Sequence, residues 1–421
     1  MATREAAASA LVDLASLRAQ FPALSEKVNG HTAVYFDAPG GTQVPQRVID
    51  AISGYLVHSN SNTHGQFLTS HRTDEVLASA HSAMADMLGC DPDEIVFGQN
   101  MTTLTFAISR ALGRDLREGD EIITTLLDHD ANVAPWRSLE ELGAKVHAIK
   151  FKPEDCTLDL DDLQSKLSSR TKIVAVGYAS NAVGTINPVK KITAMAHEAG
   201  ALVFIDAVHF APHGAIDVRD IDCDFLACST YKFFGPHIGV LYGKREHLLR
   251  LKPYKVRPAA DTLPDRWETG TLNHEGIAGV AACVEYLADL GNQAKPETAS
   301  RRAAILAAYQ WMHGHEQELA ERLIRGLLEI PGLTFYGIRD LNRLAERTPT
   351  VSIRMKNHSP AELSRRLGEL GMYTWDGNFY ALNLTEQLRV EGSGGVLRIG
   401  LAHYATAEEI ERLLAALRSF V

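Results

Sequence analysis

A lysine at the end of an apolar strand is the strongest chemical signal in this sequence. The residues Phe225 to Cys228 are apolar, and Ser229, Tyr231 and Lys232 follow them before Gly235-Pro236 interrupts the chain. A lysine among apolar neighbours can have a lowered pKa and form a Schiff base. In an arbitrary protein, a solvated lysine at a strand end would be the simpler interpretation.

A second strand end carries a carboxylate. Asp206 follows the apolar residues Leu202 to Ile205 and precedes Lys232 by 26 residues. A buried aspartate needs a cationic partner, and a protonated pyridine nitrogen provides one. An aspartate on a pyridinium and a lysine in imine linkage are the pair that pyridoxal 5′-phosphate requires. Taken alone, Asp206 could equally be a helix N-cap.

A third segment could hold the phosphate of such a cofactor. Thr102 and Thr103 stand at a predicted helix start, directly after a strand that ends in Gly98. Helix N-termini bind phosphate readily because their N–H groups are free, and Ser229 and Tyr231 could reach the same group. Threonine is also a common N-cap, so this signal is weak by itself.

Two more strand ends carry ring-binding candidates. His129 could stack on a flat cofactor ring and take part in proton transfer, although a lone histidine is more often structural. Asn181 could donate to a ring hydroxyl or to the substrate, and its alternative is a turn asparagine. Arg398 lies in the apolar strand Val396 to Leu401, where its fork could bind a carboxylate of the substrate or form a structural ion pair.

The elements that must position these residues alternate between strands and helices. Parallel pairing through helical crossovers follows, and the apolar strands indicate a sheet that is covered on both faces. We therefore predict an α/β, doubly wound domain. The predicted strands are Ile95 to Phe97, Glu121 to Leu126, Val146 to Lys150, Ile173 to Tyr178, Leu202 to Asp206, Phe225 to Cys228 and Ile238 to Tyr242.

A smaller α+β domain is predicted to follow. We assign residues 1–30 to an N-terminal segment that packs across both domains, 31–297 to the large domain and 298–421 to the small one. The expected elements of the second half are helices at Glu275 to Leu290, Thr298 to Leu328, Pro360 to Leu370 and Ala407 to Phe420, and strands at Thr334 to Tyr336 and Thr350 to Met355. Three loops are expected to line the pocket, at 37–43, 252–265 and 375–380.

Composition excludes several other classes of protein. The 421 residues have a formal net charge of −10 and no basic cluster, so nucleic acid is not an expected partner. No apolar run reaches the roughly 20 residues of a membrane span. The N-terminus has Asp13 where a signal peptide needs an apolar core, and we interpret it as a lead-in to a helix. Five cysteines without CxxC spacing favour reduced thiols in the cytoplasm and no metal site.

Together these segments resemble the class V aminotransferase family of fold-type I pyridoxal-phosphate enzymes, and within it the branch of cysteine desulfurases and selenocysteine lyases. The resemblance runs in register from Val34 to Tyr404 and is carried by DHDANVAPW, SNAVGT, IDAVH, STYKFFGPHIGVLYG and WETGT. It implies a seven-stranded, mainly parallel sheet and a homodimer with active sites at the subunit interface.

The resemblance also implies a role for each matching residue. Lys232 would bind the cofactor and move protons at the substrate Cα, and Asp206 would pair with the pyridinium nitrogen. His129 would stack on the ring, with Asn181 and His209 near its hydroxyl group, and Arg398 would hold the substrate carboxylate. The remaining matches are Thr103, Ser229 and Tyr231 in the phosphate cup, Thr271 reaching the phosphate of the partner subunit, and His64 in the wall of the active site.

One departure from the family pattern concerns the reaction. Desulfurases carry a nucleophilic cysteine before the strand with the arginine, but residues 373–380 here contain none, and no cysteine follows Cys283. Because a thiolate must attack sulfur to form a persulfide, we predict a lyase that eliminates across the C–S bond of a cysteine derivative. An aminotransferase or an amino-acid epimerase or racemase on the same scaffold is the alternative, and a non-catalytic pyridoxal-phosphate-binding protein a remote one.

Overall fold

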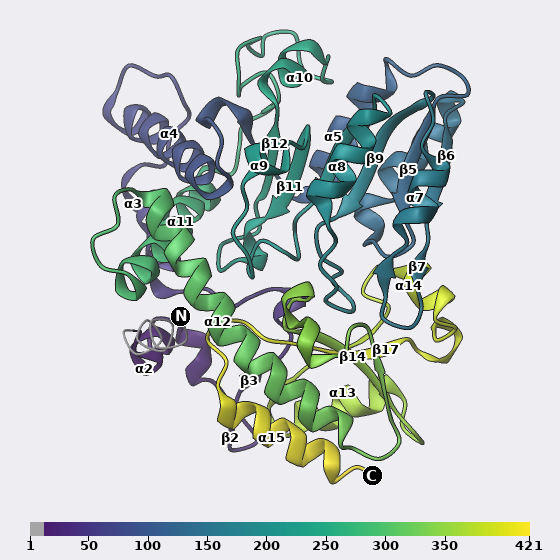
Figure 1. Ribbon diagram of the computed structural model, residues 1–421. Helices are drawn as coiled ribbons and strands as arrows, with labels where there is room; N and C mark the ends of the chain where they lie inside the picture. Colours follow the sequence, from purple (N-terminus) through teal and green to yellow (C-terminus); the bar gives the residue numbers. More distant parts are fainter. Residues whose placement is uncertain (1–11) are drawn as a thin grey trace.

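The computed structural model describes residues 12–421, and Figure 1 shows a larger domain above a smaller one. Most of the predicted N-terminal lead-in lies outside the described residues. Within them the chain begins with the short helix α2 (Leu14–Arg18), whose N-cap Asp13 accepts a hydrogen bond from the Ala15 N–H. In the part from residue 12 onward, no helix has the length and apolar character needed to cross a membrane.

All seven predicted strands form, and they share one sheet in the order β4-β12-β11-β10-β9-β5-β6. Only β12 runs antiparallel to its neighbours, β11 and β4. The strands are β4 (Ile95–Gly98), β5 (Glu121–Thr125), β6 (Lys145–Ile149), β9 (Thr171–Gly177), β10 (Leu202–Asp206), β11 (Phe225–Ser229) and β12 (Gly239–Gly243). The prediction of a mainly parallel sheet is confirmed, and every strand except β12 ends at the same edge.

Helices cover both faces of this sheet. Successive residues of β10 point into different cores, with Phe204 in one and Val203 and Ile205 in the other, as the two-residue period of a strand requires. The first core includes α5 (Met101–Gly113), α6 (Ala134–Arg137) and α10 (Arg245–Arg250). The second includes α3 (Gln46–His58), α4 (Leu68–Leu88), α7 (Leu160–Lys166), α8 (Val189–Glu198), α9 (Val218–Ile221) and α11 (His274–Ala294).

The small domain is built on a four-stranded sheet in the order β13-β14-β17-β16. Its strands are β13 (Leu333–Tyr336), β14 (Thr350–Met355), β16 (Trp375–Gly377) and β17 (Val396–Gly400). Helices α13 (Pro360–Glu369) and α15 (Ala407–Arg418) contribute to its core, and α14 (Leu382–Gln387) precedes β17. The N-terminus of α15 is fixed by a capping box, in which Thr406 and Glu409 bond each other's backbone N–H groups.

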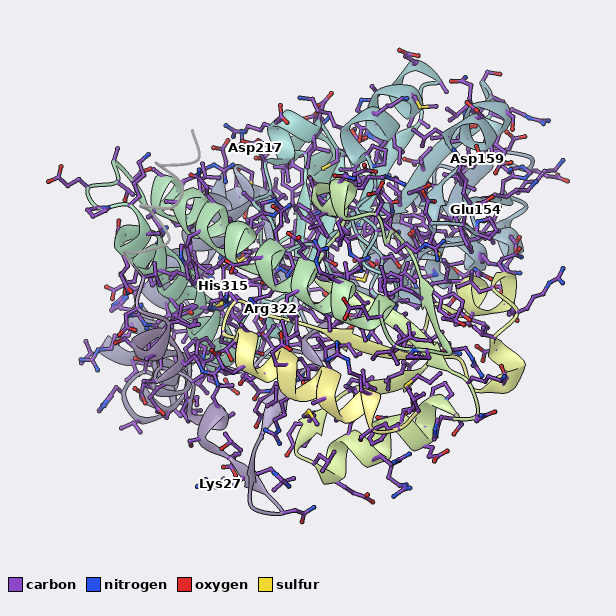
Figure 2. The ribbon with its side chains drawn as sticks, turned by 60° about the horizontal axis from the view of Figure 1, so that its bottom comes forward. Lys27, Glu154, Asp159, Asp217, His315 and Arg322 are labelled. Atoms are coloured by element: carbon purple, nitrogen blue, oxygen red, sulfur yellow. The ribbon has the colours of Figure 1, made fainter. Side chains whose placement is uncertain are left out.

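The long helix α12 (Arg301–Leu328) joins the two domains. Its first half, up to Met312, lies in a core of the large domain, and its second half, from Leu319, lies in the core of the small domain. Figure 2 shows His315 and Arg322 on this helix beside α15, where they bond the Ala405 carbonyl and Glu411. The division at residue 298 stays a prediction.

The beginning of the chain also crosses between the domains. Strand β3 (Val34–Tyr35) pairs in parallel with β15 (Met372–Tyr373), and Phe36 is buried in the core of the small domain. The remaining strands are the two-residue pairs β1 (Lys27–Val28) with β2 (His31–Thr32), and β7 (Phe151–Lys152) with β8 (Thr157–Leu158). The turn after β3 therefore lies where the two domains meet, next to the end of β17.

Candidate active site

A cavity of about 290 Å³ lies at the carboxyl edge of the large sheet, where the small domain closes over it. Most of the predicted site residues line it, although they come from separate strand ends and, for one, from the small domain. They are Thr102, His129, Asn181, Asp206, His209, Ser229, Tyr231, Lys232 and Arg398. The sheet brings them together because parallel strands present their carboxyl ends at one edge.

Lys232 lies in a single turn after β11, at the inner end of this cavity. Its Nζ donates to the Pro39 carbonyl and lies 4.7 Å from the centre of the Tyr231 ring. Burial lowers the pKa of Lys232 to about 7, and the positive charge of Arg398 acts in the same direction. A large share of the amine is therefore neutral near pH 7, which is the form that attacks a carbonyl.

Asp206 ends β10 and keeps one oxygen available. Its Oδ1 accepts the Val208 N–H at 2.9 Å, and burial raises the pKa of Asp206 to about 7, with the charge of Asp128 adding to the effect. A carboxylate with a raised pKa gains from a cation placed beside it. Asp206 can thus hold a protonated ring nitrogen.

His129 follows β5 at the same edge of the sheet, and its ring lines the cavity. Its Nδ1 accepts the Ala131 N–H at 3.0 Å, so the ring proton must be on Nε2. Burial lowers the pKa of His129 to about 4, and the charges of Lys232 and Arg398 contribute. A neutral imidazole can stack on a flat ring without placing a second positive charge beside Lys232.

His209 has its hydrogen-bonding roles fixed by Thr348. The Thr348 hydroxyl donates to the Gly184 carbonyl, so it accepts from His209 Nε2 at 3.2 Å. The His209 Nδ1 atom is then left as an acceptor, and burial lowers the pKa of His209 well below its usual value. His209 can accept a hydrogen bond from a ring hydroxyl, whereas it cannot donate one through Nδ1.

The N-terminus of α5 forms the other end of the cavity. Asn100 caps the helix by accepting the Thr103 N–H at 2.9 Å, and Ser229 Oγ accepts the Met101 N–H at 3.2 Å. Gly239 packs so closely that a Cβ there would stand 2.4 Å from the Asn100 carbonyl carbon. The Met101 and Thr103 N–H groups are thus bonded, and the Thr102 N–H between them has no intrahelical partner and can donate to an anion.

Thr103 does not take the place predicted for it. Its hydroxyl donates to the Asn100 carbonyl at 2.9 Å as part of the helix cap, and it does not line the cavity. Thr102, one residue earlier, does. A step of one residue turns a helical side chain by about 100°, which is why the cap and the cavity use different threonines.

Arg398 stands in the middle of β17 and is 4% exposed. One of its terminal nitrogens donates to the Asn181 carbonyl at 2.9 Å, while its Nε and the Asn181 Oδ1 are buried without a partner among the described residues. Burial lowers the pKa of Arg398 to about 9. The unbonded Arg398 donor beside the cavity indicates a ligand with acceptor oxygens, such as a carboxylate, and the Asn181 Oδ1 can accept from a ligand donor.

Two predicted residues lie elsewhere within the single chain. His64 and Thr271 line a separate cavity of about 600 Å³, to which Pro264 and Asp265 also belong. The backbone N–H of His64 donates to Asp74, which holds it on that side. The wall position predicted for His64 is therefore not formed in one chain. None of the residues 252–265 lines the active-site cavity of the single chain either, whereas 37–43 and 375–380 both contribute to it.

Two further aspartates were given no individual role by the sequence analysis, the buried Asp128 and the partly buried Asp37. Asp128 accepts from Asn132 Nδ2 and from the Gly177 N–H, both at 2.9 Å, and braces two strand ends. Asp37 has a buried, unpartnered Oδ1, and burial raises its pKa to about 6. Asp206 was singled out because it directly follows an apolar strand. Asp128 also comes just after a predicted strand, so the same reasoning could have identified it. Asp37 lies in the predicted pocket loop 37–43, but it follows a strand of only two residues, so no strand end distinguished it from the rest of the loop.

The residues present fit pyridoxal 5′-phosphate. The amine of Lys232 is a partner for its aldehyde, and the free oxygen of Asp206 is a partner for its ring nitrogen. The Thr102 backbone at the N-terminus of α5 is a partner for its phosphate. Among residues 12–421, no group of histidine, cysteine, aspartate or glutamate side chains is placed to hold a metal ion.

Comparison with known proteins agrees with this geometry. The family described as Aminotransferase class-V matches residues 34–413. A cysteine desulfurase of Synechococcus elongatus is 34% identical over 96% of this chain, which spans 63% of that protein's length. A cysteine desulfurase of Pectobacterium atrosepticum is 32% identical over 96% of both chains. The solved apo structure of a cysteine desulfurase from Thermococcus onnurineus has a TM-score of 0.85 and 27% identity, over 97% of this chain and 98% of that one.

Proposed function

This chain belongs to the Aminotransferase class-V family of pyridoxal-phosphate-dependent enzymes, and on that premise we propose that it is a lyase that cleaves the C–S bond of a cysteine derivative. The balanced reaction is β-elimination with water, which gives a thiol, pyruvate and ammonium. The observation that carries the proposal is a cavity with a complete Lys232, Asp206 and Arg398 set and no thiol in its lining.

The chain's own residues support each step of an elimination. When bound, pyridoxal phosphate draws electrons from the substrate Cα, so that the Cα proton becomes acidic and a group on Cβ can leave. Asp206 keeps a proton on the ring nitrogen. Arg398, held by the backbone carbonyl of Asn181, orients the substrate through its carboxylate. Lys232, with its lowered pKa, removes the Cα proton.

The positions of the cysteines do not favour a mechanism through an enzyme persulfide. All five lie within the described residues, and none is among the residues that line the active-site cavity. Cys156, Cys223, Cys228 and Cys283 are buried, and burial raises the pKa of each thiol, to about 12 for Cys156. Cys90 is half-buried, with a pKa also raised by burial. This arrangement within one chain supports elimination over a route that needs a thiolate nucleophile at the reacting sulfur.

A homodimer is the second part of the proposal. Five apolar side chains of the stretch that ends in α4 are exposed, namely Ile49, Leu56, Val57, Phe67 and Leu68. His64 belongs to the same stretch and shares the second cavity with Thr271. A second copy that covered this surface would bury the apolar side chains and would give His64 and Thr271 their predicted roles at the interface.

Product analysis tests the reaction. We expect holoenzyme given S-methyl-L-cysteine to release methanethiol, pyruvate and ammonium in equal amounts, and Lys232→Ala to abolish this while retaining bound substrate. Transfer of the amino group to a 2-oxo acid would favour the aminotransferase, and loss of optical purity without ketone the epimerase or racemase. Absence of any spectral change on addition of amino acids would support a non-catalytic binding protein.

Light scattering of the holoenzyme tests the proposed dimer. The mass of a monomer would refute it.

A further inference from the structure

Three aromatic side chains from one short segment line the outer part of the active-site cavity. They are Trp375, Phe379 and Tyr380. Trp375 is 52% exposed and Tyr380 is 73% exposed, although both are large side chains with apolar surface. Exposed aromatic rings that share a cavity form a surface that a ligand can cover.

The sheet register places one of these rings beside the carboxylate-binding arginine. Strand β16 pairs with β17 so that Trp375 is directly opposite Arg398. Directly opposed residues project from the same face of a sheet, so the indole and the guanidinium are neighbours. The Phe379 ring covers the other side of Arg398, with the guanidinium carbon 4.0 Å from the ring centre. An amino acid held on Arg398 therefore lies among aromatic rings.

The segment holds a conformation that its residue types disfavour. Phe379 and Tyr380 have φ angles of 57° and 60°, in the left-handed region that bulky residues avoid. Hydrogen bonds from the large domain hold both residues there. Asn181 Nδ2 donates to the Phe379 carbonyl at 2.9 Å, and the Asp130 N–H donates to the Tyr380 carbonyl at 2.7 Å. Strain that is kept in place by active-site residues indicates a function for the rings.

The outer part of the cavity is also uncharged. The ionisable residues in its lining are Asp128, His129, Asp206, His209, Lys232 and Arg398, with the phenol groups of Tyr231 and Tyr380. The carboxylates, Lys232 and Arg398 all belong to the cofactor end or to the carboxylate site. Tyr380 stacks on the neutral His129 ring, with centroids 5.3 Å apart and planes at 27°. Within one chain, a substituent that extends outward from Arg398 meets aromatic surface and no counter-ion.

We propose that the substrate is a cysteine whose sulfur carries a bulky aromatic or arylalkyl group, and that Trp375 and Tyr380 bind that group. This inference rests on the proposed function for the identity of the leaving sulfur, and on the cavity alone for the aromatic side chain. Free cysteine would leave both rings uncovered.

Two amino acids that cannot undergo the elimination test the binding without the reaction. 2-Amino-5-phenylpentanoate and norvaline replace the sulfur of S-benzyl- and S-methyl-cysteine by a methylene group. Titrated into holoenzyme by calorimetry, the phenyl compound should bind at least tenfold more tightly than norvaline. It should also shift the fluorescence of Trp375, because it covers the indole. Each aromatic contact accounts for about tenfold in affinity at most.

Variants assign the preference to individual residues. Trp375→Ala and Tyr380→Asn should each reduce the preference for the phenyl compound by about three- to tenfold, whereas Trp375→Phe should keep most of it. Asparagine suits Tyr380 because it tolerates a positive φ. Trp311→Phe is the matched control, since this indole stacks on His315 of α12, outside the cavity lining. It should leave both the preference and the fluorescence shift unchanged.

The outcomes separate this inference from the reaction. Equal binding of the two compounds, or a preference that Trp375→Ala and Tyr380→Asn leave unchanged, would overturn the inference. Tighter binding of S-(2-aminoethyl)-cysteine than of S-benzyl-cysteine would overturn it as well, because a cationic side chain would then be favoured. A preserved phenyl preference without thiol release from any cysteine derivative would refute the proposed reaction and leave the aromatic site standing.

Discussion

The lowered pKa of Lys232 gives a quantitative prediction about cofactor capture. A lysine with a pKa of 10.5 has about one neutral amine in 3,000 at pH 7, whereas a pKa of about 7 makes about half of the amines neutral. Lys232 in the apoprotein should therefore react with the aldehyde of pyridoxal phosphate with a midpoint near pH 7. Below the midpoint the rate should fall about tenfold for each pH unit.

Borohydride trapping measures this directly. Apoprotein is mixed briefly with pyridoxal phosphate at pH values from 5 to 10 and reduced, and the modified lysine is located by peptide mass spectrometry. Surface lysines in the same digest are an internal control, because their reactivity should keep rising up to about pH 10.

A second variant separates the two causes of the lowered pKa. Burial is the larger cause and the charge of Arg398 contributes, so Arg398→Gln should raise the midpoint of Lys232 without returning it to 10.5. A midpoint near 10 in the unsubstituted protein would refute the argument from burial. A midpoint that Arg398→Gln leaves unchanged would refute the electrostatic coupling.

Three further predictions concern binding and stability. Arg398→Ala should weaken substrate binding by about 2–4 kcal/mol, seen mainly as a higher KM, and an unchanged KM would contradict its carboxylate role. Gly239→Ala should displace the N-terminus of α5, because the new Cβ would stand 2.4 Å from the Asn100 carbonyl carbon. We expect the free energy of unfolding to fall by about 1–3 kcal/mol and the cofactor to be released faster in dialysis. Unchanged stability and unchanged cofactor release would contradict the close approach. For Asp224, burial opposes ionisation, but hydrogen bonds from His247 and His197 lower its pKa from 3.8 to about 2. The stabilisation by ionised Asp224 is present above about pH 4 and is lost as the pH falls towards 2. Asp224→Asn should therefore lower the free energy of unfolding in urea by about 2 kcal/mol at pH 7 and make stability less dependent on pH below 4. An unchanged acid dependence in the variant would assign that dependence to other groups.

The sequence predicted the large domain well because its signals are local. Apolar strands bounded by helices identify a doubly wound sheet. Polar residues at the ends of those strands then pointed to Asp206 and Lys232, which lie in the same cavity. Thr103 shows the limit of such reasoning, because a cap and a cavity residue differ by one position on a helix. The sequence could not distinguish Thr102 from Thr103, because that requires knowing how α5 is rotated about its own axis.

Other placements depend on information that no local pattern carries. His64 and Thr271 lie on loops, and their predicted roles depend on a second copy of the chain. The placement of Trp375 beside Arg398 depends on strand register in the small sheet. Register is set by the buried pattern of both strands together, and β16 is only three residues long.

Helix α12 has a consequence for how this protein unfolds. One uninterrupted helix of 28 residues contributes side chains to the cores of both domains, so neither core can be exposed without disturbing the other. The two domains should therefore behave as one cooperative unit. Amide hydrogens in the middle of α12 should exchange only through global unfolding, and a fragment that ends before Arg301 should fail to reach a native fold.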